Sequence, residues 1–274
     1  MIEINNLTKK YGDHVAVDHL TMKVEPGRIY GFLGPNGAGK STTMNIITGY
    51  LGATEGEVKI NGFDIFTEAE EAKAQIGYLP ELPPLYENMT VYEYLTFVAE
   101  LKKRPKAGRK QEIIDVMEEC HITEMANRLI KNLSKGYKQR VGLAQAIMGY
   151  PDIIILDEPT VGLDPKQIIE IRELIKKLGQ DHTVILSSHI LTEISAVCDY
   201  VFIINNGKLV AADATENLLN TTAASGETEI VIRGNGKKAK ELLQEHGFDV
   251  LEVRSAGTSL EDVFLKLTNE GGEE

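Results

Sequence analysis

Eight residues near the start of the chain, Gly34–Ser41, have the types and the spacing of a loop that holds phosphate groups. They read Gly-Pro-Asn-Gly-Ala-Gly-Lys-Ser, which fits the pattern G-x-x-x-x-G-K-[ST]. Glycines allow a tight backbone turn whose N–H groups point at an anion. We expect Lys40 to reach the β- and γ-phosphates of a nucleoside triphosphate and the Ser41 hydroxyl to ligate Mg²⁺. The residues expected to contact the nucleotide here are Asn36, Gly37, Ala38, Gly39, Lys40, Ser41 and Thr42.

Two adjacent carboxylates, Asp157 and Glu158, follow the branched apolar run Ile153–Leu156. Such a run predicts a strand buried on both faces, as in a parallel sheet, and ligands bind at the carboxyl ends of such strands. One acid would hold Mg²⁺ while the next orients and deprotonates an attacking water. A solvated acidic turn is the alternative, but it does not explain the pairing with a phosphate loop.

At three further sites, the residues alone leave two interpretations open. His189 ends the next predicted strand of the core; a histidine there is more often structural, although its place beside the acid pair favours contact with the γ-phosphate. Ser134 and Gly136 begin a predicted helix, either as a simple cap or as a second anion-binding turn. Tyr11 lies in a polar turn, either as a loop aromatic or as a surface on which a base stacks.

The elements that must position these residues follow from hydrophobic periodicity. The apolar segment Arg28–Leu33 predicts a strand before the phosphate loop, and a helix starts near Thr42 after it. Within Ile2–Val24, two bursts of alternation, Ile2–Ile4 and Leu20–Val24, predict antiparallel strands, and Val58–Gly62 supplies another. Residues 81–149 form a helical insertion, in which 105–108 separate two helices, Val91–Leu101 and Lys110–Cys120. The fold class is therefore α/β, with a mostly parallel sheet, an N-terminal antiparallel β subdomain and an inserted helical subdomain.

A change of composition near residue 220 predicts a second domain. The small-residue linker Thr221–Gly226 precedes a strand, a helix, a strand and a closing helix. These elements are expected over Thr228–Arg233, Lys237–His246, Val250–Arg254 and Leu260–Thr268. Residues 1–220 are thus the nucleotide-binding domain and 221–274 a small α/β accessory domain.

Composition limits the class of partner. The 274 residues carry a formal net charge of -12, which argues against a nucleic-acid partner. Cys120 and Cys198 match no metal or redox spacing. The start of the chain lacks the features of a signal peptide, and no apolar run approaches the roughly 20 residues that cross a bilayer. We therefore expect a soluble, cytoplasmic polypeptide.

Taken together, these motifs resemble the ATP-binding subunit of an ABC transporter over essentially residues 1–220. The positions that carry the resemblance are, in chain order, Tyr11, Gly34–Ser41 (Walker A), Glu81, Leu133–Tyr137 (signature), Asp157–Glu158 (Walker B), Gly162–Asp164 (D-loop) and His189 (switch). The resemblance implies a P-loop NTPase core with the subdomains described above. The tail segment Ser259–Leu265 is similar to that of ATPases serving ABC-2 exporters.

The resemblance also implies roles for single residues. Tyr11 would stack on adenine, and Glu81 would lie in the loop that senses the γ-phosphate and contacts the membrane partner. Asp164 is expected at the nucleotide. The implied catalytic residues are Glu158, His189, Lys40 and Glu81, and the implied metal ligands are Ser41, Glu81 and Asp157.

The family's mechanism needs two subunits, as a homodimer or with a paralogue. Each ATP would sit between Lys40 and Ser41 of one subunit and Ser134 and Gly136 of the other. Closing and opening would drive an integral membrane permease and, in the exporter type, power export. The chain would then lie at the cytoplasmic face of the cell membrane, with ATP and Mg²⁺ as cofactors.

Two positions depart from the family pattern. Glu81 stands where most members have Gln; we expect it still to ligate Mg²⁺, because its loop is otherwise intact. The signature reads Ser-Lys-Gly-Tyr over 134–137 rather than Ser-Gly-Gly-Gln. Lys135 adds a cation near a polyanion, whereas Tyr137 cannot reproduce a Gln side chain.

Other functions fit less well. A soluble ATPase of the same superfamily, acting on ribosomes or DNA, typically fuses two cores or carries basic extensions, and this chain has one core and an acidic balance. A purely regulatory nucleotide-binding module does not need the Asp157–Glu158 pair. A GTPase would carry an Asn-Lys-x-Asp segment.

Overall fold

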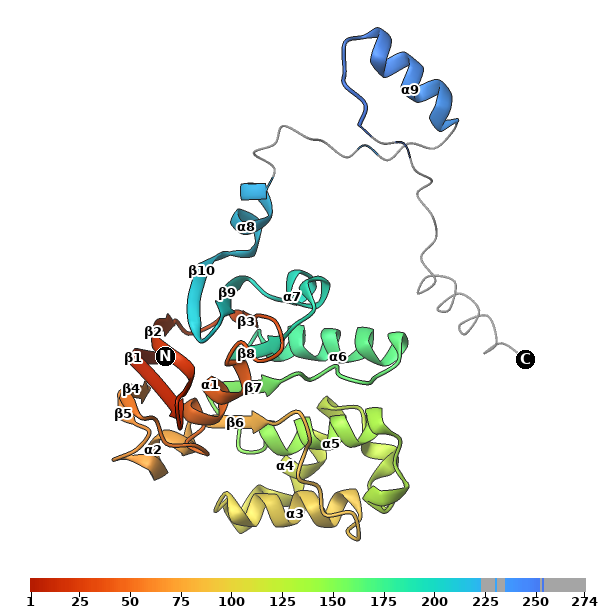
Figure 1. Cartoon of the computed structure of the whole chain (residues 1–274). Helices are drawn as coiled ribbons and strands as arrows, with labels where there is room; N and C mark the ends of the chain where they lie inside the picture. The colour runs from red at the N-terminus through yellow and green to blue at the C-terminus, as the bar shows by residue number, and fades with distance from the viewer. Residues whose placement is uncertain (223–229, 231–234, 252, 254–274) are drawn as a thin grey trace, which may run out of the picture. The chain divides into compact units, whose positions relative to one another are not determined.

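The structure, a computed structural model, describes residues 1–222, 230, 235–251 and 253 (Figure 1). The chain divides into two compact units, Met1–Leu218 and Leu219–Glu274. In the second unit the expected helix is present as α9 (Gly236–Glu245), which Asn235 caps. The two strands and the last helix expected there, and the exporter-like tail segment, fall wholly or partly outside the described residues.

A six-stranded sheet forms the centre of the first unit, with the strand order β10-β9-β3-β8-β7-β6. Its strands are β3 (Ile29–Leu33), β6 (Ile76–Leu79), β7 (Ile153–Asp157), β8 (Thr183–Ser188), β9 (Tyr200–Asn205) and β10 (Lys208–Ala214). Neighbouring strands are parallel, except that β10 pairs antiparallel with β9. This arrangement confirms the mostly parallel sheet predicted from the apolar runs.

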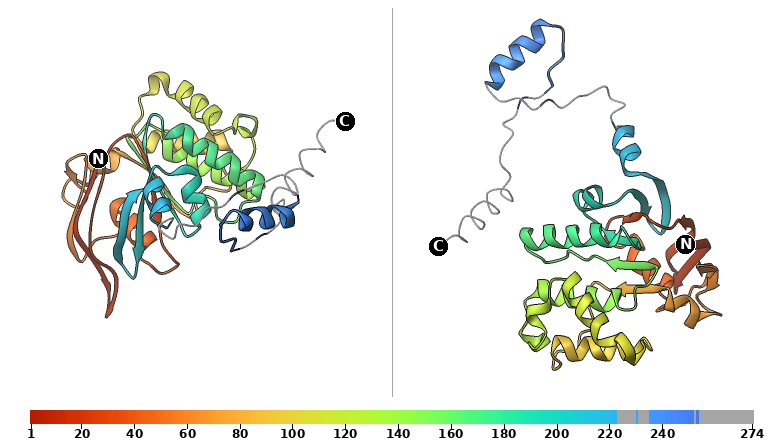
Figure 2. Two further views of the ribbon diagram at one scale, coloured as in Figure 1. Left: turned by 90° about the horizontal axis from the view of Figure 1, so that it is seen from above. Right: turned by 180° about the vertical axis from the view of Figure 1, so that it is seen from behind.

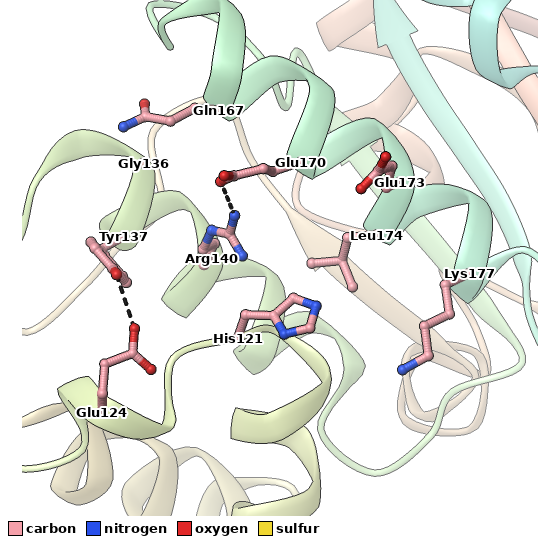
Figure 3. A pocket seen from close by; sticks show the side chains of 10 residues that line it. All are labelled: His121, Glu124, Gly136, Tyr137, Arg140, Gln167, Glu170, Glu173, Leu174 and Lys177. Atoms are coloured by element: carbon pink, nitrogen blue, oxygen red, sulfur yellow. Dashed lines mark hydrogen bonds and ion pairs between the residues drawn. The ribbon is translucent and has the colours of Figure 1, made fainter. Parts of the chain in front are cut away.

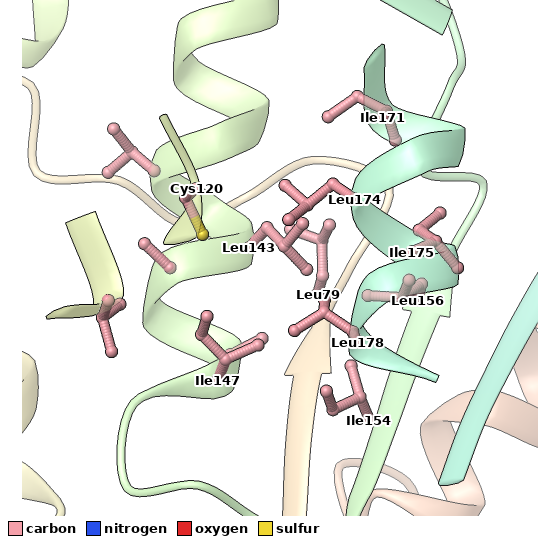
Figure 4. Packing of buried hydrophobic residues seen from close by; sticks show 14 of the residues in the cluster. Leu79, Cys120, Leu143, Ile147, Ile154, Leu156, Ile171, Leu174, Ile175 and Leu178 are labelled. Atoms are coloured by element: carbon pink, nitrogen blue, oxygen red, sulfur yellow. The ribbon is translucent and has the colours of Figure 1, made fainter. Parts of the chain in front are cut away.

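Strand β7 shows why its sequence is apolar at successive positions. Ile153 and Ile155 belong to one buried cluster, whereas Ile154 and Leu156 belong to the other. Because successive side chains of a strand point to opposite faces, each face of the sheet is covered by its own hydrophobic layer. Figure 4 shows the layer that α5 (Lys135–Ile147) and α6 (Pro165–Leu178) form over Leu79, Ile154 and Leu156.

The other layer joins this sheet to a second, antiparallel sheet of order β2-β1-β4-β5. Its strands are β1 (Ile2–Tyr11), β2 (His14–Val24), β4 (Glu55–Ile60) and β5 (Phe63–Asp64). Strands β1 and β2 are longer than alternation in the sequence indicates. Their register shifts between Ile4 and Leu7 and again near Lys9, and each shift breaks the period of two on which the prediction depended.

The helical subdomain contains α3 (Val91–Leu101), α4 (Lys106–Glu119), η1 (Thr123–Met125), η2 (Ile130–Asn132) and α5. In Figures 1 and 2 these helices lie away from the antiparallel sheet. Helix α3 has its predicted bounds, and Thr90 and Glu93 form a capping box at its start. The predicted linker 105–108 is partly wrong: Lys106 opens α4, and the non-helical angles are confined to Ala107 and Gly108.

Four shorter helices complete the first unit: α1 (Lys40–Ile47), α2 (Ala69–Ala74), α7 (Leu191–Val197) and α8 (Thr215–Thr222), which ends four residues beyond it. Within the described part of the chain, no helix is long and apolar enough to span a membrane.

Candidate functional site

The register of the central sheet brings the predicted residues to one edge. Leu33 pairs with Ser188, Asp157 with Ser187, and Leu79 with Leu156. The strands β3, β8, β7 and β6 therefore end together, since parallel strands present their carboxyl ends at the same edge. The phosphate loop follows β3, His189 follows β8, Glu158 follows β7, and Glu81 lies in the bend after β6.

The phosphate loop has the backbone that its glycines predict. Gly37 and Gly39 have φ of 80° and 102°, in the left-handed region. A Cβ at Gly39 would fall 2.4 Å from the carbonyl oxygen of Ala16, so a larger residue does not fit. Helix α1 starts directly after the loop, at Lys40, and its first N–H groups have no intrahelical acceptor. The loop and the helix start together provide donors for an anion.

Lys40 is buried inside this loop. Its Nζ donates to the carbonyl oxygens of Gly34, at 2.8 Å, and Pro35, at 3.3 Å. The same Nζ lies 3.5 Å from Glu158 Oε1, and both side chains are less than a tenth exposed. A buried ammonium needs such partners because desolvation of a charge is costly. The predicted phosphate-binding lysine and the predicted catalytic acid are therefore in contact.

Asp157 meets two hydroxyl groups from different segments. Ser41 Oγ donates to Asp157 Oδ1 at 3.3 Å, and Ser187 Oγ donates to the same oxygen at 2.5 Å. Adjacent oxygen ligands of an octahedral Mg²⁺, each about 2.1 Å from the metal, lie about 3 Å apart. The spacing of Ser41 Oγ and Asp157 Oδ1 therefore fits a shared Mg²⁺.

Glu158 is held in a sharp turn at the end of β7. Its φ is 49°, in the left-handed region that non-glycine residues seldom adopt, and its N–H donates to Ser187 Oγ at 3.0 Å. Its carboxylate lies 3.0 Å from His189 Nδ1. A local strain of this kind persists where surrounding contacts fix it, and it is common at functional sites. The acid and the histidine that sequence analysis placed on neighbouring strands thus contact each other.

The signature and D-loop residues lie at two helix starts. Ser134 caps α5 by accepting from Tyr137 N, and Asp164 caps α6 by accepting from Gln167 N at 2.9 Å. The cap predicted for Ser134 is confirmed, while anion binding at Ser134 and Gly136 stays a prediction. Lys135 is exposed, and its Nζ lies against Gly162, where a Cβ would meet it.

Two predicted residues stand apart from the bonded cluster. Tyr11 ends β1 with about half of its surface exposed, and Lys9 Nζ lies 5.3 Å from its ring centroid. Glu81 is exposed. Among the described residues, no hydrogen bond or ion pair joins either side chain to Lys40, Asp157 or Glu158.

Sequence analysis missed Ser187, which bonds both acids at once. The signal was present in the sequence. Ser187 follows the apolar run Val184–Leu186 near the end of a strand, and that strand comes next after the predicted acid strand. A fully buried hydroxyl in such a place requires partners, and the register of β7 and β8 supplies them.

Comparisons with known proteins agree with this geometry. A family model described as ABC transporter matches residues 17–161. The bacitracin transport ATP-binding protein BcrA of Bacillus licheniformis is 36% identical over 303 residues, which cover 99% of this chain and 98% of that protein. The linearmycin resistance ATP-binding protein LnrL of Bacillus subtilis (strain 168) is 33% identical, covering 85% of this chain and 76% of that protein. The dimeric structure of MJ0796, a bacterial ABC transporter cassette, superposes with a TM-score of 0.71 at 27% identity, covering 78% of this chain and 99% of that one.

Proposed function

This chain belongs to the ABC transporter family as an ATP-binding subunit, and from that premise we propose that it hydrolyses ATP to power transport through a separate membrane subunit. The observation that carries the proposal is the convergence of Lys40, Asp157, Glu158 and His189 at one edge of the sheet. A module that merely binds nucleotide needs the lysine but not a buried acid held against a histidine.

Each residue of that edge has a proposed task. The loop 36–42 and Lys40 bind the phosphates of ATP, and Tyr11 stacks on the adenine. Ser41, Asp157 and Glu81 hold Mg²⁺, which when bound neutralises phosphate charge. Glu158 polarises the attacking water.

His189 holds the γ-phosphate from β8. The contact between His189 Nδ1 and the Glu158 carboxylate keeps the two groups on the same side of the site. Because Glu158 is buried and His189 is partly exposed, the γ-phosphate and the attacking water would reach these two groups from the solvent side.

We propose that the active form is a dimer. Ser134, Gly136 and Asp164 make no hydrogen bond or ion pair with the Lys40–Glu158 cluster within the described chain, so these residues would serve the ATP of a second subunit. The similarity to a dimeric bacterial ABC transporter cassette, with a TM-score of 0.71, supports the proposal of a dimer. The second subunit is another copy or a paralogue.

The transport partner is proposed to be an integral membrane permease, with this chain at its cytoplasmic face. Two relatives carry the words bacitracin transport and linearmycin resistance in their names. Removal of a compound from the cell is one way in which a transporter confers resistance to it, so we propose export as the direction. We also propose that residues 221–274 form a separate accessory domain.

The substitution Glu158→Gln tests this function. It keeps the shape of the side chain but removes the base, so we expect hydrolysis to fall about 10²-fold or more while ATP binding persists. Gel filtration with ATP should then show a trapped dimer. Glu71→Gln on exposed α2 is the matched control and should behave as the wild type. A Glu158→Gln protein that stays monomeric and turns over normally would overturn the proposal.

A further inference from the structure

The start of α5 lies directly against the segment that leads from Glu158 to α6. Gly136 is buried there, and a Cβ at this position would fall 2.6 Å from Gln167 Cδ. Lys135 Nζ covers the α-carbon of Gly162. The turn proposed to serve the partner's ATP therefore contacts the first turn of α6 through Gly136, and Lys135 in the same turn contacts the segment that follows this chain's own catalytic acid.

Arg140 extends this contact one turn further along α5. Its guanidinium donates through one terminal nitrogen to the carbonyl oxygen of Cys120, at 3.2 Å, and through the other to Glu170 Oε2 on α6, at 2.5 Å. The Arg140 side chain is 10% exposed and that of Glu170 is 40% exposed. A planar fork can bind two acceptors at once, whereas a single ammonium has no such fixed geometry. Arg140 thus joins the end of α4, α5 and α6, and Figure 3 shows its bond to Glu170.

This ion pair differs from the other one that crosses the same boundary. Among the described residues, two ion pairs join 81–149 to the rest of the first unit: Arg140–Glu170 and Lys103–Glu70. The side chains of Lys103 and Glu70 are 84% and 87% exposed. An exposed pair contributes little, because water screens it. Breaking the Arg140–Glu170 pair would instead leave a mostly buried charge without its counter-ion.

The pair also spans a gap that apolar packing does not fill. A cavity of about 470 Å³ separates the two walls, and its lining includes Tyr137, Arg140, Glu170 and Lys177. On the wall formed by the helical subdomain, Tyr137 OH donates to Glu124 Oε1 at 2.9 Å, which fixes α5 to η1. Among the described side chains of α5, Arg140 is the one that reaches across the gap and bonds to α6. At this end of the α5–α6 interface the bridge between the walls is therefore polar, whereas further along the same helices share one apolar cluster.

We propose that Arg140 and Glu170 are positioning residues of the ATPase cycle. The pair holds the signature turn, Ser134–Gly136, at a fixed distance from the Glu158–Asp164 segment. In the dimer, each chain offers its signature turn to one ATP and its Glu158 to the other ATP. The ion pair would make these two parts of the chain move together. This inference rests on the dimer proposed above and deepens it, because it names the contact that couples the two sites.

Dimer formation in the hydrolysis-deficient Glu158→Gln background tests the proposal. Adding Glu170→Gln, which removes the charge but keeps the size, should raise the dissociation constant of the ATP-bound dimer about tenfold, and Arg140→Lys should do the same. A tenfold change corresponds to about 1.4 kcal/mol. Binding of a fluorescent ATP analogue to the single subunit should stay unchanged, since neither residue belongs to that half-site. Sedimentation equilibrium measures the first quantity and fluorescence titration the second.

The control is Glu70→Gln in the same background. It removes the exposed Lys103–Glu70 ion pair and should leave the dissociation constant of the ATP-bound dimer unchanged. If Glu158→Gln alone stays monomeric with ATP, the proposed dimer is wrong. If it dimerises, and the added Glu170→Gln leaves the constant within twofold, the positioning role is wrong. A loss of ATP binding by the single subunit, in step with a lower Tm, would show a merely structural role and would also overturn the inference.

Discussion

At the scale of single residues, Ser187 connects the two acids of the site. Its hydroxyl donates to Asp157 Oδ1 and accepts from Glu158 N, and its side chain is fully buried. Hydrogen bonds to charged groups contribute about 1.5–3 kcal/mol each. We expect Ser187→Ala to lower kcat about tenfold or more, because both acids lose a fixed partner, while the chain still folds.

Steady-state hydrolysis and a thermal melt measure the two parts of this prediction. Ser195→Ala, at an exposed position of α7, is the matched control, because it removes a serine hydroxyl whose described bond is to its own helix. An undiminished kcat for Ser187→Ala would mean that the bonds of Ser187 do not orient the acids during turnover.

Glu81 carries a second prediction at this scale. It is exposed after β6 and stands where the family usually has Gln. A carboxylate binds Mg²⁺ more strongly than an amide does. We expect Glu81→Gln to raise the Mg²⁺ concentration needed for half-maximal hydrolysis several-fold, measured by metal titration at saturating ATP. If the titration curve does not move, Glu81 is not a metal ligand.

At the scale of elements, the sequence predicted what depends on local pattern. Helix α3 was predicted to the residue from its apolar spacing, which is a local pattern, and the structure adds the Thr90–Glu93 capping box at its start. The full lengths of β1 and β2 were not predicted, because bulges shift the register. Ser187 and Arg140 were missed for another reason: each bonds to a partner 30 residues away, and a linear pattern does not encode which strands or helices will lie side by side.

The junction of α3 and α5 gives a pH-dependent prediction. Lys102 Nζ donates to the carbonyl oxygens of Ala146 and Met148 at the end of α5. Burial lowers the pKa of Lys102 from its ordinary 10.5 to about 8. Between these values the unfolded chain binds a proton that the folded chain does not, so this group's contribution to the free energy of unfolding rises with pH. Below about pH 8, both states are protonated and the folded state carries the full cost of burying the charge.

Comparison with Lys102→Met isolates that contribution. From pH 8 to about 10.5, the free energy of unfolding of the wild type should rise relative to that of the variant by up to about 1.4 kcal/mol per pH unit. Denaturant unfolding at each pH gives both values. Lys103→Met, at an exposed neighbour, should show a constant difference. If the free energies of unfolding of the wild type and of Lys102→Met change with pH in parallel, then Lys102 is not a buried ammonium with a lowered pKa.

At the scale of the whole molecule, the division into two units separates the site from the tail. The first unit, Met1–Leu218, contains both hydrophobic clusters and every residue assigned to the ATP site. A unit of this size with its own core is expected to fold independently. We therefore expect a chain that ends at Thr222 to melt cooperatively and to hydrolyse ATP within about twofold of the full-length rate, because the contacts described for Lys40, Asp157 and Glu158 all lie within residues 1–222.

The truncation and Glu158→Gln within it form a matched pair, since residual hydrolysis in the second would reveal a contaminating ATPase. If the truncated chain folds but loses activity or dimer formation, residues 223–274 must contribute to closure rather than simply accompany it. If activity persists in solution, the tail's task lies elsewhere, and reconstitution of the truncated chain with the membrane subunit would show whether that task is coupling: transport would fall while hydrolysis continued.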